Sequence, residues 1–280
     1  MGGRDRAGRL PLCLAAVGIS AIGAGLLVPA VANASSPQPA TQREHQISER
    51  QVSERQVAPA PSAQLVRSPL PSDLRATVEI QRILVPVDGG DLAVYPAPDA
   101  TEASQVLPAI NELDSPLVLL TTAAVGDWYQ VLLPTRPNGA TAWVPASAVT
   151  VSVPQHRLEV SLSSHELRVV AIADGAVVMT SPIGIGAPSS PTPSGLFFVR
   201  DHFPTEGAGH PYGPFAFGLS GHSDVHMQFG TGDGRIAIHG TNQPSSIGAA
   251  VSNGCPHVPN DVVLALIPYL PLGTPVLIAP

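Results

Sequence analysis

A stretch near the C-terminus, IHGTNQPSSIGAAVSNGCPH from Ile238 to His257, holds the residue types needed for nucleophilic cysteine chemistry. A cysteine attacks as its thiolate, and a histidine within hydrogen-bond reach can take up the thiol proton. Cys255 follows His239 by sixteen residues, and the pattern RIAIHG predicts a strand that ends at His239. Cys255 as a nucleophile with His239 as its base is therefore one hypothesis, and a small buried cysteine is the alternative.

Acyl transfer at such a cysteine also needs donors for an oxyanion and an acceptor that orients the histidine. Gly254 directly precedes Cys255, and an unhindered backbone there would let successive N–H groups point at one spot. We expect the N–H groups of Asn253, Gly254 and Cys255 to form the oxyanion site. The carbonyl of Gly240 is placed to orient the imidazole of His239.

The cysteine count depends on an N-terminal segment that has the features of an export signal. Three arginines precede the apolar run 10–28, which contains Cys13 and is followed by small residues up to Ala34. This pattern predicts a signal peptide over residues 1–34, with an uncleaved membrane anchor through residues 10–28 as the alternative. Cleavage would leave Cys255 as the one thiol, so no intramolecular disulfide could form, and the thiol would be either part of an intermolecular bridge or a reactive group.

Metal and nucleic-acid chemistry are both disfavoured. His222 and His226 would share one face of a strand, but zinc needs at least three protein ligands and no third is indicated. We therefore predict no metal site, although a metal-dependent hydrolase built on this pair is a competing hypothesis. The chain has a formal net charge of −7, which argues against a nucleic-acid partner because such proteins present basic patches.

Composition divides the remaining chain into three parts. Residues 35–76 lack aromatic side chains and carry a tandem SERQV repeat, so they are predicted to be a disordered linker. Residues 77–153 contain short β-rich runs between turn residues. Residues 156–280 continue with strands and end in one short helix, with Asn260 as its N-cap and apolar residues at helical spacing up to Leu270.

The segment DWYQVLLPTRPNGATAWVP predicts a β-hairpin within the middle part. Its turn would lie at Pro137, Asn138 and Gly139, with Trp128 and Trp143 on the two strands. Residues 77–153 resemble the small SH3-like barrels that precede catalytic domains in bacterial wall enzymes. The two tryptophans are then either core residues or part of a wall-binding face.

The motif IHGTN followed by SNGCPHVPND resembles the L,D-transpeptidase family, whose members cross-link bacterial peptidoglycan. SPTPSGLFFV, PYGPFAFGLSGHS and PLGTPVLI resemble further segments of the same family, so the likeness extends from His156 to Ala279. The resemblance implies a mainly β fold: a β-sandwich-like catalytic domain with one short C-terminal helix, preceded by the small SH3-like β-barrel.

Residue by residue, the resemblance makes Cys255 the nucleophile and His239 the proton acceptor and later donor. It assigns the orienting carbonyl to Gly240 and the oxyanion site to Asn253, Gly254 and Cys255. Substrate-binding positions carried over in the same way are Ser252, His222 and His257. His257 stands where many members have arginine or asparagine, so its contact with substrate would depend on pH.

The implied reaction attacks the carbonyl between the third residue and the terminal D-Ala of a tetrapeptide stem, releases D-Ala and passes the acyl group to an amine of another stem. No cofactor is implied, the partners are peptidoglycan stem peptides, and we expect an exported monomer in the cell envelope. An L,D-carboxypeptidase and a catalytically inactive wall-binding protein are alternatives. A catalytic Cys255 is expected to react with iodoacetamide faster than a free thiol below pH 7.

Overall fold

The computed structural model describes residues 81–229 and 232–280, which belong to one compact unit of the chain, Leu65–Pro280. The signal peptide or anchor predicted for residues 1–34 and the linker predicted for 35–76 lie outside the described residues. Within the described residues, the structure is mainly β, as predicted, and none of its helices has the length and apolarity to cross a bilayer.

The N-terminal part of the described chain is an antiparallel five-stranded sheet in the order β6-β5-β4-β1-β7, with a separate two-stranded pair, β2-β3. The predicted hairpin is confirmed: β5 and β6 pair in antiparallel register, with Gln130 opposite Trp143, and Gly139 in the turn has a φ of +79°. Assignment of this part to the SH3-like class stays a prediction. The elements are β1 (Ile83–Pro86), β2 (Leu92–Val94), β3 (Gln105–Leu107), β4 (Leu119–Val125), β5 (Trp128–Leu132), β6 (Thr141–Pro145), η1 (Ala146–Ala148) and β7 (Val149–Ser152).

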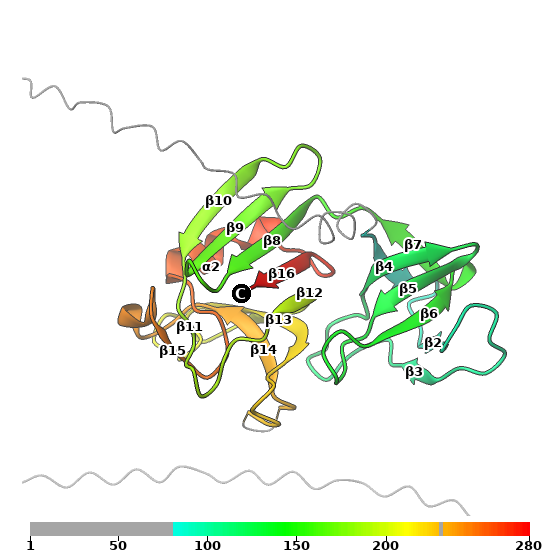
Figure 1. Cartoon of the computed structure of the whole chain (residues 1–280), viewed down its shortest axis with the longest axis horizontal. Helices are drawn as coiled ribbons and strands as arrows, with labels where there is room; N and C mark the ends of the chain where they lie inside the picture. The colour runs from blue at the N-terminus through cyan, green and yellow to red at the C-terminus, as the bar shows by residue number, and fades with distance from the viewer. Residues whose placement is uncertain (1–80, 230–231) are drawn as a thin grey trace, which may run out of the picture. The chain divides into compact units, whose positions relative to one another are not determined.

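The C-terminal part is built on a seven-stranded sheet in the order β10-β9-β8-β16-β12-β13-β14. The last strand, β16, lies between β8, to which it is parallel, and β12, to which it is antiparallel (Figure 1). The elements are β8 (His156–Ser161), β9 (Glu166–Ala171), β10 (Val177–Pro182), β11 (Ile185–Gly186), β12 (Gly195–Pro204), β13 (Phe215–His222), β14 (Arg235–His239), η2 (Pro244–Ser246), β15 (Ala250–Ser252), α2 (Asn260–Ala265), η3 (Ile267–Tyr269) and β16 (Pro275–Ala279).

Strand β12 contributes to two hydrophobic cores because successive side chains of a strand point to opposite faces. Phe197 and Val199 pack in the core of the C-terminal sheet, whereas Phe198, fully buried, packs with the residues of β1, β4, β5 and β6. The continuous apolar run LFFV is therefore explained by burial on both faces.

The C-terminal helix is shorter than the sequence predicts. Pro259 is the N-cap, and Asn260 is the first helical residue rather than the cap. The helix ends before Leu266, and a 3-10 turn containing Pro268 follows, because a proline cannot continue the hydrogen-bond ladder of an α-helix. Asn260 instead directs its side chain at the chain that follows β14, where its Oδ1 accepts a hydrogen bond from the Thr241 N–H at 2.8 Å.

Candidate active site

Backbone pairing between two distant segments brings His239 beside Cys255. The His239 N–H donates to the Pro256 carbonyl at 3.2 Å, and the Val258 N–H donates to the His239 carbonyl at 2.9 Å. This is a parallel bridge between His239 and His257. The loop from Thr241 to Gly254 thus returns to the end of β14, as the sequence spacing predicts, and Cys255 lies next to the bridge.

The imidazole of His239 is buried, with 2% of the residue exposed, and its orientation is fixed by one contact. Its Nδ1 lies 2.5 Å from the Gly240 carbonyl oxygen. Because a carbonyl can only accept, Nδ1 carries the hydrogen and Nε2 is left as the basic nitrogen of a neutral ring. Burial, together with the nearby His257, lowers the pKa of His239 to about 3.

Cys255 is a free cysteine that is partly buried, and its thiol is held in the neutral form. Burial raises the pKa of the Cys255 thiol to about 11, and the Ala237 N–H, which donates to Sγ at 3.4 Å, opposes this only in part. No hydrogen bond joins Sγ to His239 within the described residues. The raised pKa predicts a thiol that reacts more slowly than a free thiol, whereas the sequence predicts a faster one, because desolvation here outweighs the stabilisation of the thiolate by the Ala237 N–H.

The loop that carries Cys255 turns at Gly254, which has a φ of +115°. A residue with a Cβ would be strained in this conformation. The Gly254 N–H donates to the Ser252 Oγ at 3.1 Å, so it is already engaged, contrary to the expectation that it faces an oxyanion. Among the described residues no partner is found for the N–H groups of Asn253 and Cys255.

Two aromatic rings contact the imidazole of His239. The Tyr212 ring lies 4.4 Å from it between centroids, and the His257 ring lies 4.6 Å from it. His257 is fixed through its Nδ1, which is 3.0 Å from the buried Ser246 Oγ, and burial lowers its pKa. Burial also raises the pKa of Tyr212, with a further contribution from Cys255.

These groups line one cavity of about 240 Å³, large enough for several atoms of a peptide chain. The cavity brings together the predicted residues Cys255, His239, Ser252, Asn253 and His257. It is completed by residues from the loops that surround them: Pro211, Tyr212, Phe229, Thr241, Asn242, Gln243 and Val251.

His222 does not belong to this cavity, contrary to the expectation that it forms part of the pocket wall. It is 2% exposed, and its Nε2 lies 3.0 Å from Asp233 Oδ2. Burial lowers the pKa of His222. His226 contacts Ser190 Oγ through Nε2 at 3.0 Å, and no group of three or more potential metal ligands occurs among residues 81–229 and 232–280.

Sequence reasoning missed Tyr212, Phe229 and Ser246 as residues of the site, together with the contact that Asn260 makes to Thr241. Tyr212 and Phe229 come from loops with no periodic pattern, so only the tertiary structure shows that they reach the site. Asn260 was identified in the sequence only as a helix cap, the usual role of a polar residue at a helix start. Here its side chain holds Thr241 instead.

Comparison with known proteins finds a family model that matches the same region. Residues 155–278 match the YkuD model, the L,D-transpeptidase catalytic domain. Two Bacillus proteins provisionally named L,D-transpeptidase YkuD are similar: that of Bacillus licheniformis is 39% identical over 104 residues, 37% of this chain and 54% of the relative. That of Bacillus subtilis is 36% identical over 102 residues, 36% of this chain and 54% of the relative. The chain spans about half the length of these relatives.

Solved structures of L,D-transpeptidases also align. The enzyme from Mycobacterium smegmatis aligns over 68% of this chain and 99% of its own, with 17% identity and a TM-score of 0.38. An enzyme from Mycobacterium tuberculosis H37Rv aligns over 58% of this chain and 90% of its own, also with 17% identity and a TM-score of 0.38. The segment that matches the family model, residues 155–278, includes every residue that lines the Cys255 cavity, so this part of the chain is similar to the YkuD family of L,D-transpeptidase catalytic domains.

Proposed function

We propose that the chain is an exported L,D-transpeptidase that cross-links peptidoglycan stem peptides through an acyl group carried on Cys255. The observation that carries the proposal is the shared cavity, in which the only described cysteine lies with a buried, neutral His239 whose Nδ1 is held by Gly240. The match of residues 155–278 to the family model supports the substrate class.

In the first half-reaction, the Sγ of Cys255 attacks the carbonyl carbon that precedes the terminal D-Ala of the donor stem. Both groups are neutral at rest, so the thiol proton passes to Nε2 of His239 as the S–C bond forms. The C–N bond to D-Ala then breaks, and the imidazolium gives its proton to the leaving amine. This leaves a thioester on Cys255 and free D-Ala.

In the second half-reaction, the side-chain amine of an acceptor stem attacks the thioester carbonyl. His239 takes the amine proton and returns a proton to the sulfur as the S–C bond breaks, so thiol and imidazole are restored. The N–H groups of Asn253 and Cys255 are the donors available for the oxyanion in both halves. One such donor contributes about 3 kcal/mol to transition-state stabilisation in related chemistry.

In this proposal, Ser252 and His257 are substrate-binding residues. Ser252 supports the loop by accepting the Gly254 N–H, and His257 lines the cavity with Nε2 directed away from its Ser246 contact. Because the pKa of His257 is lowered, its ring is neutral at pH 7 and would act on substrate as a hydrogen-bond partner rather than as a cation.

The remaining parts of the proposal concern the whole chain. Residues 1–34 act as the export signal, or residues 10–28 as an anchor, and residues 35–76 as a linker to an SH3-like module and the catalytic domain at 156–280. The protein works as a monomer in the cell envelope. It needs no metal or organic cofactor.

Incubation of the protein with a disaccharide-tetrapeptide, followed by mass spectrometry, tests this function, with Cys255→Ala as the control. A cross-linked dimer that lacks one D-Ala is the expected product. A tripeptide monomer alone would make the protein an L,D-carboxypeptidase, in which water replaces the amine. Absence of any Cys255-dependent product from folded protein would leave the inactive wall-binding alternative.

A further inference from the structure

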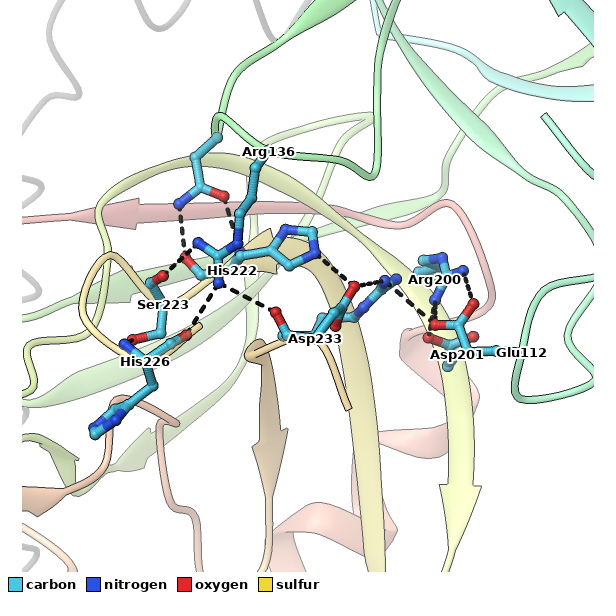
Figure 2. A network of polar contacts seen from close by, with 10 residues as sticks. Glu112, Arg136, Arg200, Asp201, His222, Ser223, His226 and Asp233 are labelled. Atoms are coloured by element: carbon cyan, nitrogen blue, oxygen red, sulfur yellow. Dashed lines mark hydrogen bonds and ion pairs between the residues drawn. The ribbon is translucent and has the colours of Figure 1, made fainter. Parts of the chain in front are cut away.

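The turn between β5 and β6 places the side chains of Arg136 and Asn138 on the backbone of residues 222–226, which begin with the last residue of strand β13. Figure 2 shows Arg136 beside His222, Ser223 and His226. Arg136 donates from Nη1 to the Ser223 carbonyl at 2.7 Å, and from Nη2 to the carbonyls of His226 at 3.0 Å and Asp233 at 3.2 Å. Hydrogen bonds from a charged donor are about twice as strong as neutral ones. A single guanidinium thus donates to three carbonyls, two within residues 222–226 and the third at Asp233.

Asn138 acts on the same segment in a different way. Its Nδ2 donates to the His222 carbonyl at 2.7 Å, and its Oδ1 accepts the His222 N–H at 2.8 Å. The side-chain amide therefore makes the pair of hydrogen bonds that an adjacent strand would make at the end of β13. The position and direction of the chain after His222 are set by this turn.

The absence of a side chain at Gly234 makes room for Arg136. A Cβ placed on Gly234, which has a φ of +78°, would lie 2.8 Å from Arg136 Nη2 and 2.1 Å from the His226 carbonyl oxygen. Any side chain at this position would displace the guanidinium or the segment that it holds. The contact is therefore a packed one rather than a loose surface interaction.

The segment held in this way reaches the catalytic cavity on two sides. Ser223 Oγ accepts the N–H groups of Val225 and His226, and the His226 ring lies 4.8 Å from Phe229, which lines the cavity. On the other side, the His226 ring contacts Ser190 Oγ. A Cβ on Gly254 would lie 3.7 Å from the Ser190 carbonyl oxygen and 4.0 Å from Ser223 Oγ, so these residues adjoin the loop before Cys255.

We propose that Arg136 and Asn138, in the N-terminal β region, are positioning residues of the active site. They fix residues 222–229, and so they hold Phe229 at the wall of the cavity that the donor stem peptide would contact. The identity of the ligand rests on the function proposed above, whereas the effect on the segment does not. Among the described residues, no hydrogen bond joins Arg136 or Asn138 to Cys255 or His239, so we expect the intrinsic reactivity of the thiol to change less than binding of the donor.

A purely structural docking role is the competing explanation, and the same chain offers a matched control. Glu112, from the N-terminal β region, makes a bidentate ion pair with Arg200 at 2.8 and 2.7 Å. Glu112 makes no hydrogen bond to residues 222–229. Glu112 also lies 3.3 Å from Arg235, which pairs with the Asp233 carboxylate at 2.7 Å. Glu112→Gln therefore weakens the contact between the two regions and reaches the segment that Arg136 holds only through this side-chain pair.

Hydrogen exchange measured by mass spectrometry on the full chain tests the positioning directly. In Arg136→Ala, we expect amide exchange in the peptide 222–229 to rise about tenfold, since the bonds that restrain it are lost. Glu112→Gln should leave this peptide as in the unchanged protein. Equal exchange in all three proteins, or an equal rise in both variants, would overturn the proposal.

Steady-state kinetics with the disaccharide-tetrapeptide test the consequence for the site. We expect Arg136→Ala to raise KM for the donor about tenfold, below the roughly 100-fold that a displacement of about 1 Å can cause. The rate of Cys255 alkylation should change less than KM. Asn138→Ala should reproduce the pattern if Arg136→Ala does not fold, and an unchanged KM in a folded variant would overturn the proposal. If the unchanged protein converts no donor, the proposed function fails while the exchange experiment still decides the positioning role.

Discussion

The Cys255 thiol is held neutral by burial, and the pH dependence of its alkylation measures that state. Burial raises its pKa from 9.0 to about 11, which lowers the thiolate fraction at pH 7.5 about 100-fold relative to a thiol with the ordinary value. A more basic thiolate is also a better nucleophile, and with a Brønsted coefficient of about 0.4–0.5 the rate constant of the thiolate rises roughly eightfold. The net expectation is alkylation about tenfold slower than that of a free thiol.

The assay treats the native full chain with iodoacetamide between pH 6 and pH 10 and follows the Cys255 peptide by mass spectrometry. N-acetylcysteine provides the reference rate, and the same peptide in urea provides the unfolded control. We expect the native rate to climb about tenfold for each pH step of one, with no plateau up to pH 10. The unfolded chain should match the reference.

A plateau below pH 8, or a native rate above the reference at pH 7, would refute this reasoning. Either result would show that His239 stabilises the thiolate more than burial penalises it, so that an ion pair exists before substrate binds. Proton transfer would then precede the attack on the donor rather than accompany it.

Three further predictions concern the stability of the fold and three residues in or beside the site. Gly254→Ala should lower the free energy of unfolding by about 1–2 kcal/mol because of the positive φ, and unchanged thermal denaturation would contradict this. Asn260→Ala removes the acceptor for the Thr241 N–H and should cost about 1–3 kcal/mol, measured by urea unfolding; an unaltered midpoint would count against that role. Because His239 stays neutral in the folded state down to a pKa of about 3 while the unfolded chain takes up a proton near the model value of 6.5, stability should fall as pH drops from about 6.5 toward 3. Urea midpoints at pH 7 and pH 4.5 measure the loss, which His239→Gln should reduce; equal midpoints for the unchanged protein would argue against a buried neutral ring.

Several elements of the fold could be predicted because they follow from local sequence patterns. The hairpin around Asn138 and Gly139 follows from turn residues between two β-rich runs, and the structure has it. The helix near the C-terminus was predicted from apolar spacing, but its end was wrong because Pro268 limits it to Asn260–Ala265. Asn260 was misassigned as a cap because sequence does not show that Thr241 lies within reach of its side chain.

The candidate site also has features that could be predicted from the sequence and features that could not. The proximity of His239 and Cys255 could be predicted, since a strand end and a returning loop of suitable length are visible in the sequence. The protonation state could not, because desolvation depends on how many atoms surround the thiol. For the same reason His222 was placed in the pocket, although its imidazole is buried against Asp233.

The sequence by itself determined the order of β-rich segments, the cysteine and histidine that meet at the cavity, and the family motif around them. Only the tertiary structure decided that Gly254 gives its N–H to Ser252, that Tyr212 and Phe229 complete the cavity, and that Arg136 holds the segment beside it. The physical reason is that chain patterns encode local conformation and burial, whereas hydrogen-bond partners far apart in the chain, and the pKa values that burial sets, exist only once the strands have packed.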